Sequence, residues 1–309
     1  MKSWCNAVKT GGHETFYPRP GWLAKGLQYI MDGEPRFFSQ PQSADDLGVG
    51  RNMAKSIGWW LVASGLAKRE TRNGPLKPSE FGNMVARHDP YMVRLGTWWL
   101  LHAAVATSKS GSTLPWFFSP GFPYRCTRTE LTELLQNELK SANGKPPSLK
   151  AVQRDVAVMM RTYAVPIPRP ITDPEDNLGS PFQRLNMWRH MRRLDRFEKS
   201  EPTPIPPEAI CMVLCALSMG NSAYEIAEGE MIDVDVEDNV MLHCSSIFGL
   251  SRDSLLEKLS KGVDALGRKR LDIRNLAGKK YIAVGNVTAS GWAATYFENS
   301  FEGRRVNAA

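Results

Sequence analysis

The sequence contains no hydrophobic run long enough to span a membrane. No stretch of eighteen consecutive apolar residues occurs among its 309 residues, and the first residues lack the apolar region of a secretory signal. The apolar fraction of 42% and the charged fraction of 23% are typical of a soluble globular protein. We therefore expect a cytoplasmic protein without a membrane partner.

Cysteine is scarce and follows no ligand pattern. The five cysteines form no CxxC pair, and their odd number argues against a disulfide framework. Cys211 and Cys215 lie four residues apart in an apolar stretch and are interpreted as small core residues. The alternative interpretation is a zinc site that includes His243 and Cys244, although adjacent residues rarely both bind one ion.

Two groups of catalytic signatures are also missing. The sequence has no GxxxxGK[ST] phosphate loop, so any use of ATP belongs to a partner protein. It has no PD…(D/E)xK or HNH cluster at convincing spacing, which weakens a nuclease interpretation based on the residues alone.

The charge of the chain is unevenly distributed. Residues 1–200 hold 28 Lys and Arg against 17 Asp and Glu, whereas residues 201–309 hold 11 against 15, and the formal net charge is +7. The basic surplus indicates a polyanion as the partner of the first two thirds. The acidic last third suits another task, such as binding a basic partner protein.

The most informative segment predicts a helix-turn-helix. Leu47-Gly-Val-Gly50 is the turn, since glycine supplies the positive φ that a sharp helix-to-helix connection needs. A second helix is predicted from about Arg51 to Ser64. Apolar residues at the i, i+4, i+7, i+8 spacing of this helix predict a buried stripe, and the polar residues on the other side are expected to be exposed. The stripe consists of Met53, Ile57, Trp60 and Leu61, and the exposed side of Arg51, Asn52, Lys55 and Ser56.

A β-wing is predicted after this helix. Residues 66–71 are expected to form a strand, Asn73-Gly74 is a hairpin signal, and a short return strand follows. In helix-turn-helix proteins the start of the second helix meets base edges, and Arg and Asn suit bidentate contacts with guanine and adenine. The wing cations would reach phosphates. They are Lys68, Arg69, Arg72 and Lys77. The alternative is a winged helix that serves only in protein packing.

A length of 309 residues is long for a single core, so several domains are expected. We predict a mainly α protein of the α+β class. It comprises an N-terminal winged helix-turn-helix domain (1–90), a central helical domain (91–200) and a C-terminal domain with helices and a small β-ribbon, suited to partner binding (201–309). The C-terminal helices and ribbon could form a second, degenerate winged helix.

The end of the central region is predicted to be a basic helix over residues 182–199. Its apolar stripe would contain Leu185, Trp188, Met191 and Leu194. Its basic side is either a solvated face or a face that follows DNA phosphates. The residues of that side are Arg189, Arg192, Arg193 and Arg196.

Several local patterns together resemble the SspB family. They occur in order over about residues 10–185, with a looser match after residue 205. They are Gly12-His-Glu-Thr-Phe, Gly21-Trp-Leu-Ala-Lys-Gly, Leu47-Gly-Val-Gly-Arg-Asn-Met, Asp89-Pro-Tyr with Thr97-Trp-Trp-Leu-Leu-His, Arg154-Asp-Val with Arg161-Thr-Tyr, and Glu175-Asp-Asn-Leu-Gly-Ser-Pro. The first and third are fairly specific in combination.

The resemblance implies a DNA-nicking component of the Ssp systems, which place single-stranded phosphorothioate marks on bacterial DNA. Its partners would be double-stranded DNA, a cysteine desulfurase, an ATPase and a sulfur-transfer enzyme. A nick would open the backbone so that sulfur can replace a non-bridging oxygen. A homodimer would suit a pseudo-palindromic site. The alternatives are a non-catalytic subunit that selects the site for partner enzymes and a winged-helix regulator.

Metal-assisted hydrolysis of a phosphodiester needs carboxylates that hold Mg²⁺ or another divalent metal, with a base or a cation nearby. His13 and Glu14 are candidates for the catalytic centre, with Arg19 and Lys25 close in sequence to bind phosphate. The other interpretation is that they fix this loop against the winged helix.

Three further carboxylates are weaker catalytic candidates. Asp155 could act with Arg161 on one helix, although an ordinary ion pair is the simpler interpretation. Glu175 and Asp176 could bind the metal or could cap a turn. Asp89 is expected to cap a helix that begins near Tyr91, and His102 to be a satisfied core histidine.

Overall fold

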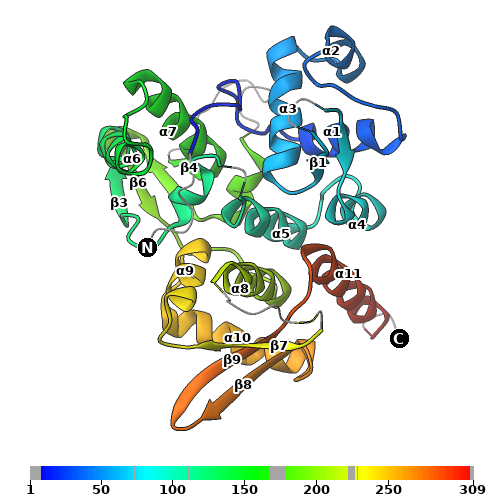
Figure 1. Ribbon diagram of the computed structural model, residues 1–309, viewed down its shortest axis with the longest axis vertical. Coiled ribbons are helices and arrows are strands. Elements are labelled where there is room, and N and C mark those ends of the chain that lie inside the picture. Colours follow the sequence, from blue (N-terminus) through cyan, green and yellow to red (C-terminus); the bar gives the residue numbers. More distant parts are fainter. Residues whose placement is uncertain are drawn as a thin grey trace.

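The computed structural model describes residues 8–71, 74–109, 111–167, 179–221, 227 and 229–306 (Figure 1). Eleven α-helices and nine strands in three small sheets are defined within these residues, which confirms the predicted α+β class. Among the described residues, every helix is too short or too polar to form a membrane span. Buried residues from all three predicted domains belong to one continuous hydrophobic core, so the domain boundaries stay a prediction.

The N-terminal region has the order expected of a winged helix. Its elements are α1 (Trp22–Met31), α2 (Pro41–Leu47), α3 (Arg51–Ala63), β1 (Ala67–Arg69), β2 (Leu76–Pro78) and α4 (Glu80–His88). Strands β1 and β2 pair antiparallel, and an isolated bridge joins Arg36 to Leu76. The helix-turn-helix and its wing are therefore present where the sequence predicts them.

The turn between α2 and α3 uses one of its two glycines in the left-handed region. Gly48 has a φ of 62°, whereas Gly50 is extended with a φ of −66°. The N–H of Val49 donates to the carbonyl of Ala44 at 3.0 Å and closes the turn. On α3, Ile57, Trp60 and Leu61 are buried as predicted, whereas Met53 is only half-buried against the same core. Ser56 is buried too, so its placement on the exposed side was wrong, because it lies on the edge of the stripe beside Ile57.

Helix α5 (Leu95–Ala106) lies at the centre of the molecule and is buried on nearly every side. It begins four residues later than predicted, because the carboxylate of Asp89 fixes the preceding turn. That carboxylate accepts hydrogen bonds from the N–H groups of Val93 and Arg94 at 3.0 Å and from Thr97 Oγ1 at 2.7 Å. Figure 1 shows α5 between the N-terminal elements and the C-terminal ones.

The rest of the central region combines helices with a four-stranded sheet. Its helices are α6 (Arg128–Asn143) and α7 (Leu149–Tyr163), with the 3₁₀ segment η1 (Leu114–Phe118) before them. The strand order is β3-β6-β5-β4, formed by β3 (Arg125–Thr127), β6 (Arg196–Lys199), β5 (Trp188–Met191) and β4 (Ala164–Ile167).

The predicted basic helix over residues 182–199 was wrong. This segment forms the 3₁₀ turn η2 (Pro181–Leu185), strand β5, the turn η3 (Arg192–Leu194) and strand β6. Asn186 and Asp195 adopt positive φ values of 54° and 41°, which end any helix. Strand β5 pairs with β4 on one side and with β6 on the other, and this tertiary pairing outweighs the helical spacing of the apolar residues.

The C-terminal region repeats the element order of the N-terminal one, with one strand added after its first helix. Helix α8 (Pro207–Asn221) is followed by β7 (Met231–Asp235), α9 (Asn239–Phe248), α10 (Arg252–Leu266), β8 (Leu271–Leu276) and β9 (Lys279–Gly285), and α11 (Ala289–Val306) ends the fold. The predicted ribbon of β8 and β9 is present and gains β7 as a third strand, in the order β7-β9-β8.

The turn between α9 and α10 has the same geometry as the turn before α3. Gly249 has a φ of 65°, and the N–H of Leu250 donates to the carbonyl of Ser245 at 2.9 Å. The hypothesis of a second winged helix is therefore confirmed in its topology. The two units lie at opposite ends of the molecule, with α5 between them (Figure 1).

Candidate nucleic-acid interface

Helix α3 is fixed to the protein through one face and leaves its first turn exposed. Ile57, Trp60 and Leu61 are fully buried, and Trp60 Nε1 donates a hydrogen bond to the carbonyl of Phe16 at 3.0 Å. The side chains at the start of the helix point into solvent, and within the described residues they form no ion pair or hydrogen bond. They are Arg51, Asn52 and Lys55. Because the helix N-terminus carries partial positive charge, this end attracts an anionic partner.

The wing adds further cations beside α3. Lys68 and Lys77 are directly opposite each other on β1 and β2, and both are exposed. Lys77 Nζ lies 2.8 Å from Glu70 Oε1, and this ion pair lowers the pKa of Glu70 below its usual value. Arg69 is exposed and forms no ion pair within the described residues. Arg72 lies outside the described residues.

Arg19 and Lys25, the two cations predicted near the catalytic centre, lie instead at the helix-turn-helix. Lys25 Nζ donates to the carbonyl of Leu47 at 2.9 Å, so it caps the end of α2. The Arg19 guanidinium lies 5.6 Å from the centre of the Trp22 ring and borders an open cleft beside the turn at Gly48. Arg19 is thus available to a ligand at the turn, and Lys25 has a structural partner.

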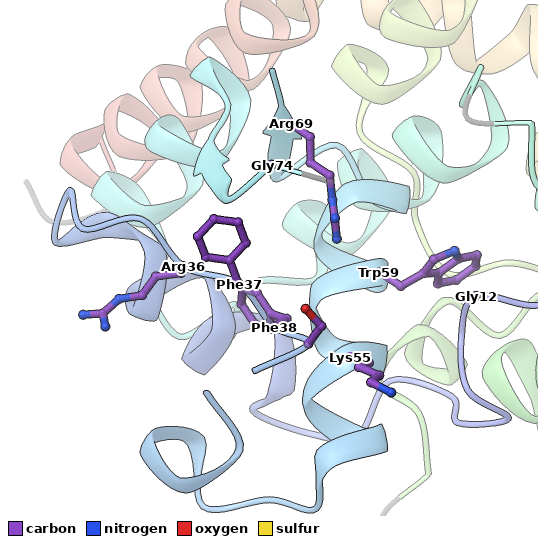
Figure 2. Close-up of a pocket in the computed structure, with 9 residues that line it drawn as sticks. Gly12, Arg36, Phe37, Phe38, Lys55, Trp59, Arg69 and Gly74 are labelled. Carbon is purple, nitrogen blue, oxygen red and sulfur yellow. The ribbon is translucent and has the colours of Figure 1, made fainter. Parts of the chain in front are cut away.

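A cleft of about 180 Å³ lies between α3 and the wing (Figure 2). Its walls come from α3, from the wing and from the segment before α2. The side chains that shape it are Lys55 and Trp59 of α3, Arg69 of β1, and Phe37 and Phe38. In Figure 2 Arg69 extends from the wing toward α3, whereas Arg36 points away from the cleft.

The structure brings together two of the predicted catalytic residues, His13 and Asp155, which are 142 residues apart. His13 Nε2 lies 3.0 Å from Asp155 Oδ1, and the N–H of Thr15 donates to His13 Nδ1 at 3.1 Å. Because Nδ1 accepts a hydrogen bond, Nε2 is the protonated nitrogen, and its N–H donates a hydrogen bond to the carboxylate of Asp155. Asp155 also accepts from the N–H of Gly11 at 2.9 Å and from Thr113 Oγ1 at 2.7 Å.

This pair is closed to solvent. His13 is 3% exposed and Asp155 is 1% exposed. The simpler interpretation, an ion pair of Asp155 with Arg161, was wrong, because Asp155 faces the segment at residues 8–16 and not its own helix. We name residues 8–16 the His13 segment. Glu14 is exposed at a φ of 49° and has no hydrogen bond within the described residues.

The His13 segment also contacts α3. The His13 ring lies edge-on to Trp59, with 5.5 Å between ring centres. Gly12 packs so closely that a Cβ there would lie 2.3 Å from Trp59 Nε1. Thr113 and Trp59 were not predicted as partners of His13. Only the Gly11-Gly12 pair before His13 indicated a close backbone approach.

The basic residues of the predicted helix lie on the β5–η3–β6 hairpin. All four are exposed: Arg189, Arg192, Arg193 and Arg196. At the tip of the hairpin, His190 Nε2 lies 2.9 Å from Asp195 Oδ1, and the guanidinium of Arg128 lies 3.8 Å from the same atom. The hairpin therefore keeps a basic surface, although on strands and not on a helix.

The described residues contain no cluster of protein ligands for a metal ion. Within them, no three His, Cys, Asp or Glu side chains converge closely enough to hold one. Glu175 and Asp176, the predicted metal ligands, lie outside the described residues. The zinc site near His243 and Cys244 is not formed, and burial raises the pKa of the Cys244 and Cys211 thiols, which keeps both thiols protonated.

His102 has the core role that the sequence predicts. It is fully buried, its Nε2 donates to the carbonyl of Ile247 at 2.9 Å, and the hydroxyl of Tyr163 donates to its Nδ1 at 3.0 Å. Burial lowers the pKa of His102 to about 4, so the ring is neutral at pH 7.

Comparison with known proteins agrees with this architecture. The fold is similar to that of a magnesium ion-bound SspB crystal structure, with a TM-score of 0.76, 19% identity and coverage of 98% of each chain. A second SspB crystal structure gives a TM-score of 0.75 at 20% identity, covering 95% of this chain and 88% of the other. The predicted resemblance to the SspB family is thus confirmed at the level of the fold.

No curated protein matches the chain. Residues 11–298 match the family described as "Protein of unknown function (DUF4007)", and the chain belongs to this family.

Proposed function

We propose that this protein binds double-stranded DNA through α3 and the wing. The observation that carries the proposal is the exposed row of Arg51, Asn52 and Lys55 at the start of α3. Arg and Asn can read guanine and adenine in the major groove, and the wing cations can contact the flanking phosphates. Each phosphate contact makes the affinity depend on salt.

Charge reversal tests this interface. Arg51→Glu with Lys55→Glu should weaken duplex binding by at least about tenfold and lower the slope of log K against log salt by roughly 0.9 for each phosphate that is no longer neutralised. Fluorescence anisotropy with a labelled duplex measures both quantities. The matched control is Arg268→Glu with Lys269→Glu, an equal change of charge on exposed residues after α10.

The outcome separates two interfaces. If the α3 variant binds duplex as tightly as the parent, DNA does not bind at α3. In that case duplex binding is measured next for a variant in which the charges of Arg192 and Arg193 on the β5–β6 hairpin are reversed, because those residues belong to the second basic surface.

The finer proposal is that the protein nicks one DNA strand within a phosphorothioation system. It rests on the ordered sequence patterns shared with the SspB family and on the likeness of fold to the SspB structures. A cysteine desulfurase, an ATPase and a sulfur-transfer enzyme are its proposed partners. The predicted metal ligands Glu175 and Asp176 lie outside the described residues, so no catalytic step is assigned to a metal ion.

Nicking is tested with supercoiled plasmid and pure protein in Mg²⁺ or Mn²⁺. Open-circular product should form, and Glu14→Ala with Glu175→Ala should abolish it while leaving duplex binding intact. Glu133→Ala, an exposed carboxylate on α6, is the control. Absence of product with either metal, or equal product from the variant, would rule out this catalytic assignment.

The alternative is a non-catalytic subunit that selects the site for partner enzymes. A specific observation favours it: His13 and Asp155 are 3% and 1% exposed and are fully engaged with the His13 segment and Thr113. A general base must reach its substrate, and a buried pair of this kind holds a loop in place. Under this alternative the pure protein binds duplex but leaves supercoiled plasmid intact.

A further inference from the structure

The cleft between α3 and the wing opens beside the elements proposed to contact DNA. Its volume is about 180 Å³. That is below the roughly 300–1,000 Å³ of pockets that enclose a drug-sized molecule. The cleft therefore has room for one planar group and not for a peptide or a whole cofactor.

Aromatic side chains form one part of the wall, and the backbone of Phe37 and the ring of Trp59 are held by neighbouring groups. Phe38 is 3% exposed, whereas Phe37 and Trp59 are half-buried, so each of the latter two offers part of its ring. The carbonyl of Phe37 accepts hydrogen bonds from Gln40 N and Ser43 Oγ at 2.9 and 3.0 Å. Trp59 is fixed by edge-on contacts with the rings of His13 and Trp60. Little freedom of the Trp59 side chain would therefore be lost when a ligand packs against it.

Two cations complete the cleft. Lys55 comes from α3 and Arg69 from β1, and neither has an ion-pair or hydrogen-bond partner within the described residues. Arg36 points away from the cleft (Figure 2) and already has two partners, since it is paired with Asp32 and its guanidinium lies 4.4 Å from the centre of the Tyr29 ring. Unpaired cations beside half-buried rings recognise a flat, electron-rich group that carries a negative charge nearby.

We infer that this cleft receives one nucleobase that has left the base stack, with its phosphate beside Lys55 and Arg69. The inference rests on the proposed binding of DNA by α3 and the wing. A phosphate alone would use the cations but gain nothing from the rings. A stacked duplex would meet the cations, but its bases would not reach the rings that line the cleft. An unstacked nucleotide uses both, as in proteins that bind extruded or single-stranded bases.

An unpaired base provides the test, since it leaves the stack at little cost. A duplex with one unpaired adenine should bind the protein about tenfold more tightly than the same duplex fully paired, a size typical of one base stacked on an aromatic ring. Phe37→Ala and Arg69→Ala should each reduce this preference to less than about twofold.

The control is Lys68→Ala. Lys68 is adjacent to Arg69 on β1 but lies on the opposite side of the strand, so its replacement should weaken both duplexes equally and preserve the preference. Thermal unfolding of each variant checks that the fold is retained, and Phe37 and Arg69 provide two independent changes of which neither is a core residue.

Each outcome is decisive. Equal binding of the paired and unpaired duplexes by the parent overturns the inference and leaves the proposed function standing. A preference that survives both variants also overturns it, because the unpaired base must then lie elsewhere. Failure to bind either duplex overturns the proposed function and the inference together.

Discussion

His102 shows how a single polar residue joins three parts of the molecule. It lies on α5, its Nδ1 accepts from Tyr163 at the end of α7, and its Nε2 donates to Ile247 on α9. The rings of Phe118 and Phe248 lie against it with centres 4.7 and 6.0 Å away. Both nitrogens have hydrogen-bond partners in the neutral form, which burial favours by lowering the pKa of His102.

The stability of the protein should therefore fall as the pH drops through the range from 6.5 to about 4. In that range the unfolded chain binds a proton at His102, whereas the folded protein does not, so protonation favours unfolding. The full effect is about 3 kcal/mol, because one pKa unit corresponds to about 1.4 kcal/mol. Urea unfolding at pH 7 and at pH 4.5 measures most of this effect, which is complete only below pH 4.

His102→Gln isolates this effect. The variant should be less stable than the parent at pH 7, since the packing with Tyr163 and Phe118 is disturbed. It should also lose less stability than the parent between pH 7 and pH 4.5. Equal losses in the two proteins would contradict the assignment of this pH dependence to His102.

At the scale of elements, the two helix-turn-helix units use the same turn. Gly48 and Gly249 both adopt left-handed conformations directly after a helix, and the residue that follows each donates back to the preceding helix. The second helix of each unit begins with an arginine, Arg51 or Arg252. The angle between the helices thus depends on a backbone conformation that other residues adopt at a cost.

Gly48→Ala should destabilise the protein by about 1 kcal/mol, because alanine at a φ of 62° meets the steric penalty of the left-handed region. Gly50→Ala is the matched control, since Gly50 has a φ of −66° and a Cβ there would make only an ordinary contact with Met53. Denaturant unfolding compares them. If Gly50→Ala lost as much stability as Gly48→Ala, the left-handed conformation of Gly48 would not be the cause of the destabilisation.

At the scale of the whole molecule, the His13 segment links the winged helix to the central region. It contacts Trp59 on α3, Asp155 on α7 and, through the carbonyl of Val8, Asn143 Nδ2 at the end of α6. Elements far apart in sequence are thus tied together by one short stretch. The position of α3 relative to α7 depends on it.

Asp155→Asn should destabilise the protein by about 2–3 kcal/mol, because three donors converge on a carboxylate that an amide cannot replace. Hydrogen exchange of residues 8–16 should rise, since their anchor is weakened. Arg154→Ala, an exposed neighbour on the same helix, should change neither quantity. Unchanged exchange in residues 8–16 of the Asp155 variant would show that these contacts do not hold the segment.

Elements that local chemistry specifies could be predicted from the sequence alone. The stripe of Ile57, Trp60 and Leu61 predicts which side of α3 is buried, and Gly48 predicts the turn. The exposed positions of Arg51, Asn52 and Lys55 follow from the same period. These features depend on residues within one or two helical turns of each other, so spacing alone reveals them.

Features that depend on distant partners became visible only in the folded chain. Residues 188–199 have the spacing of a helix but become strands, because β4 and β6 offer hydrogen-bond partners to β5. His13 and Asp155 meet across 142 residues, and the cleft beside Trp59 is assembled from α3, β1 and the segment at Phe37. Pairing across such separations is set by the packing of the whole chain, which no local pattern of residues contains.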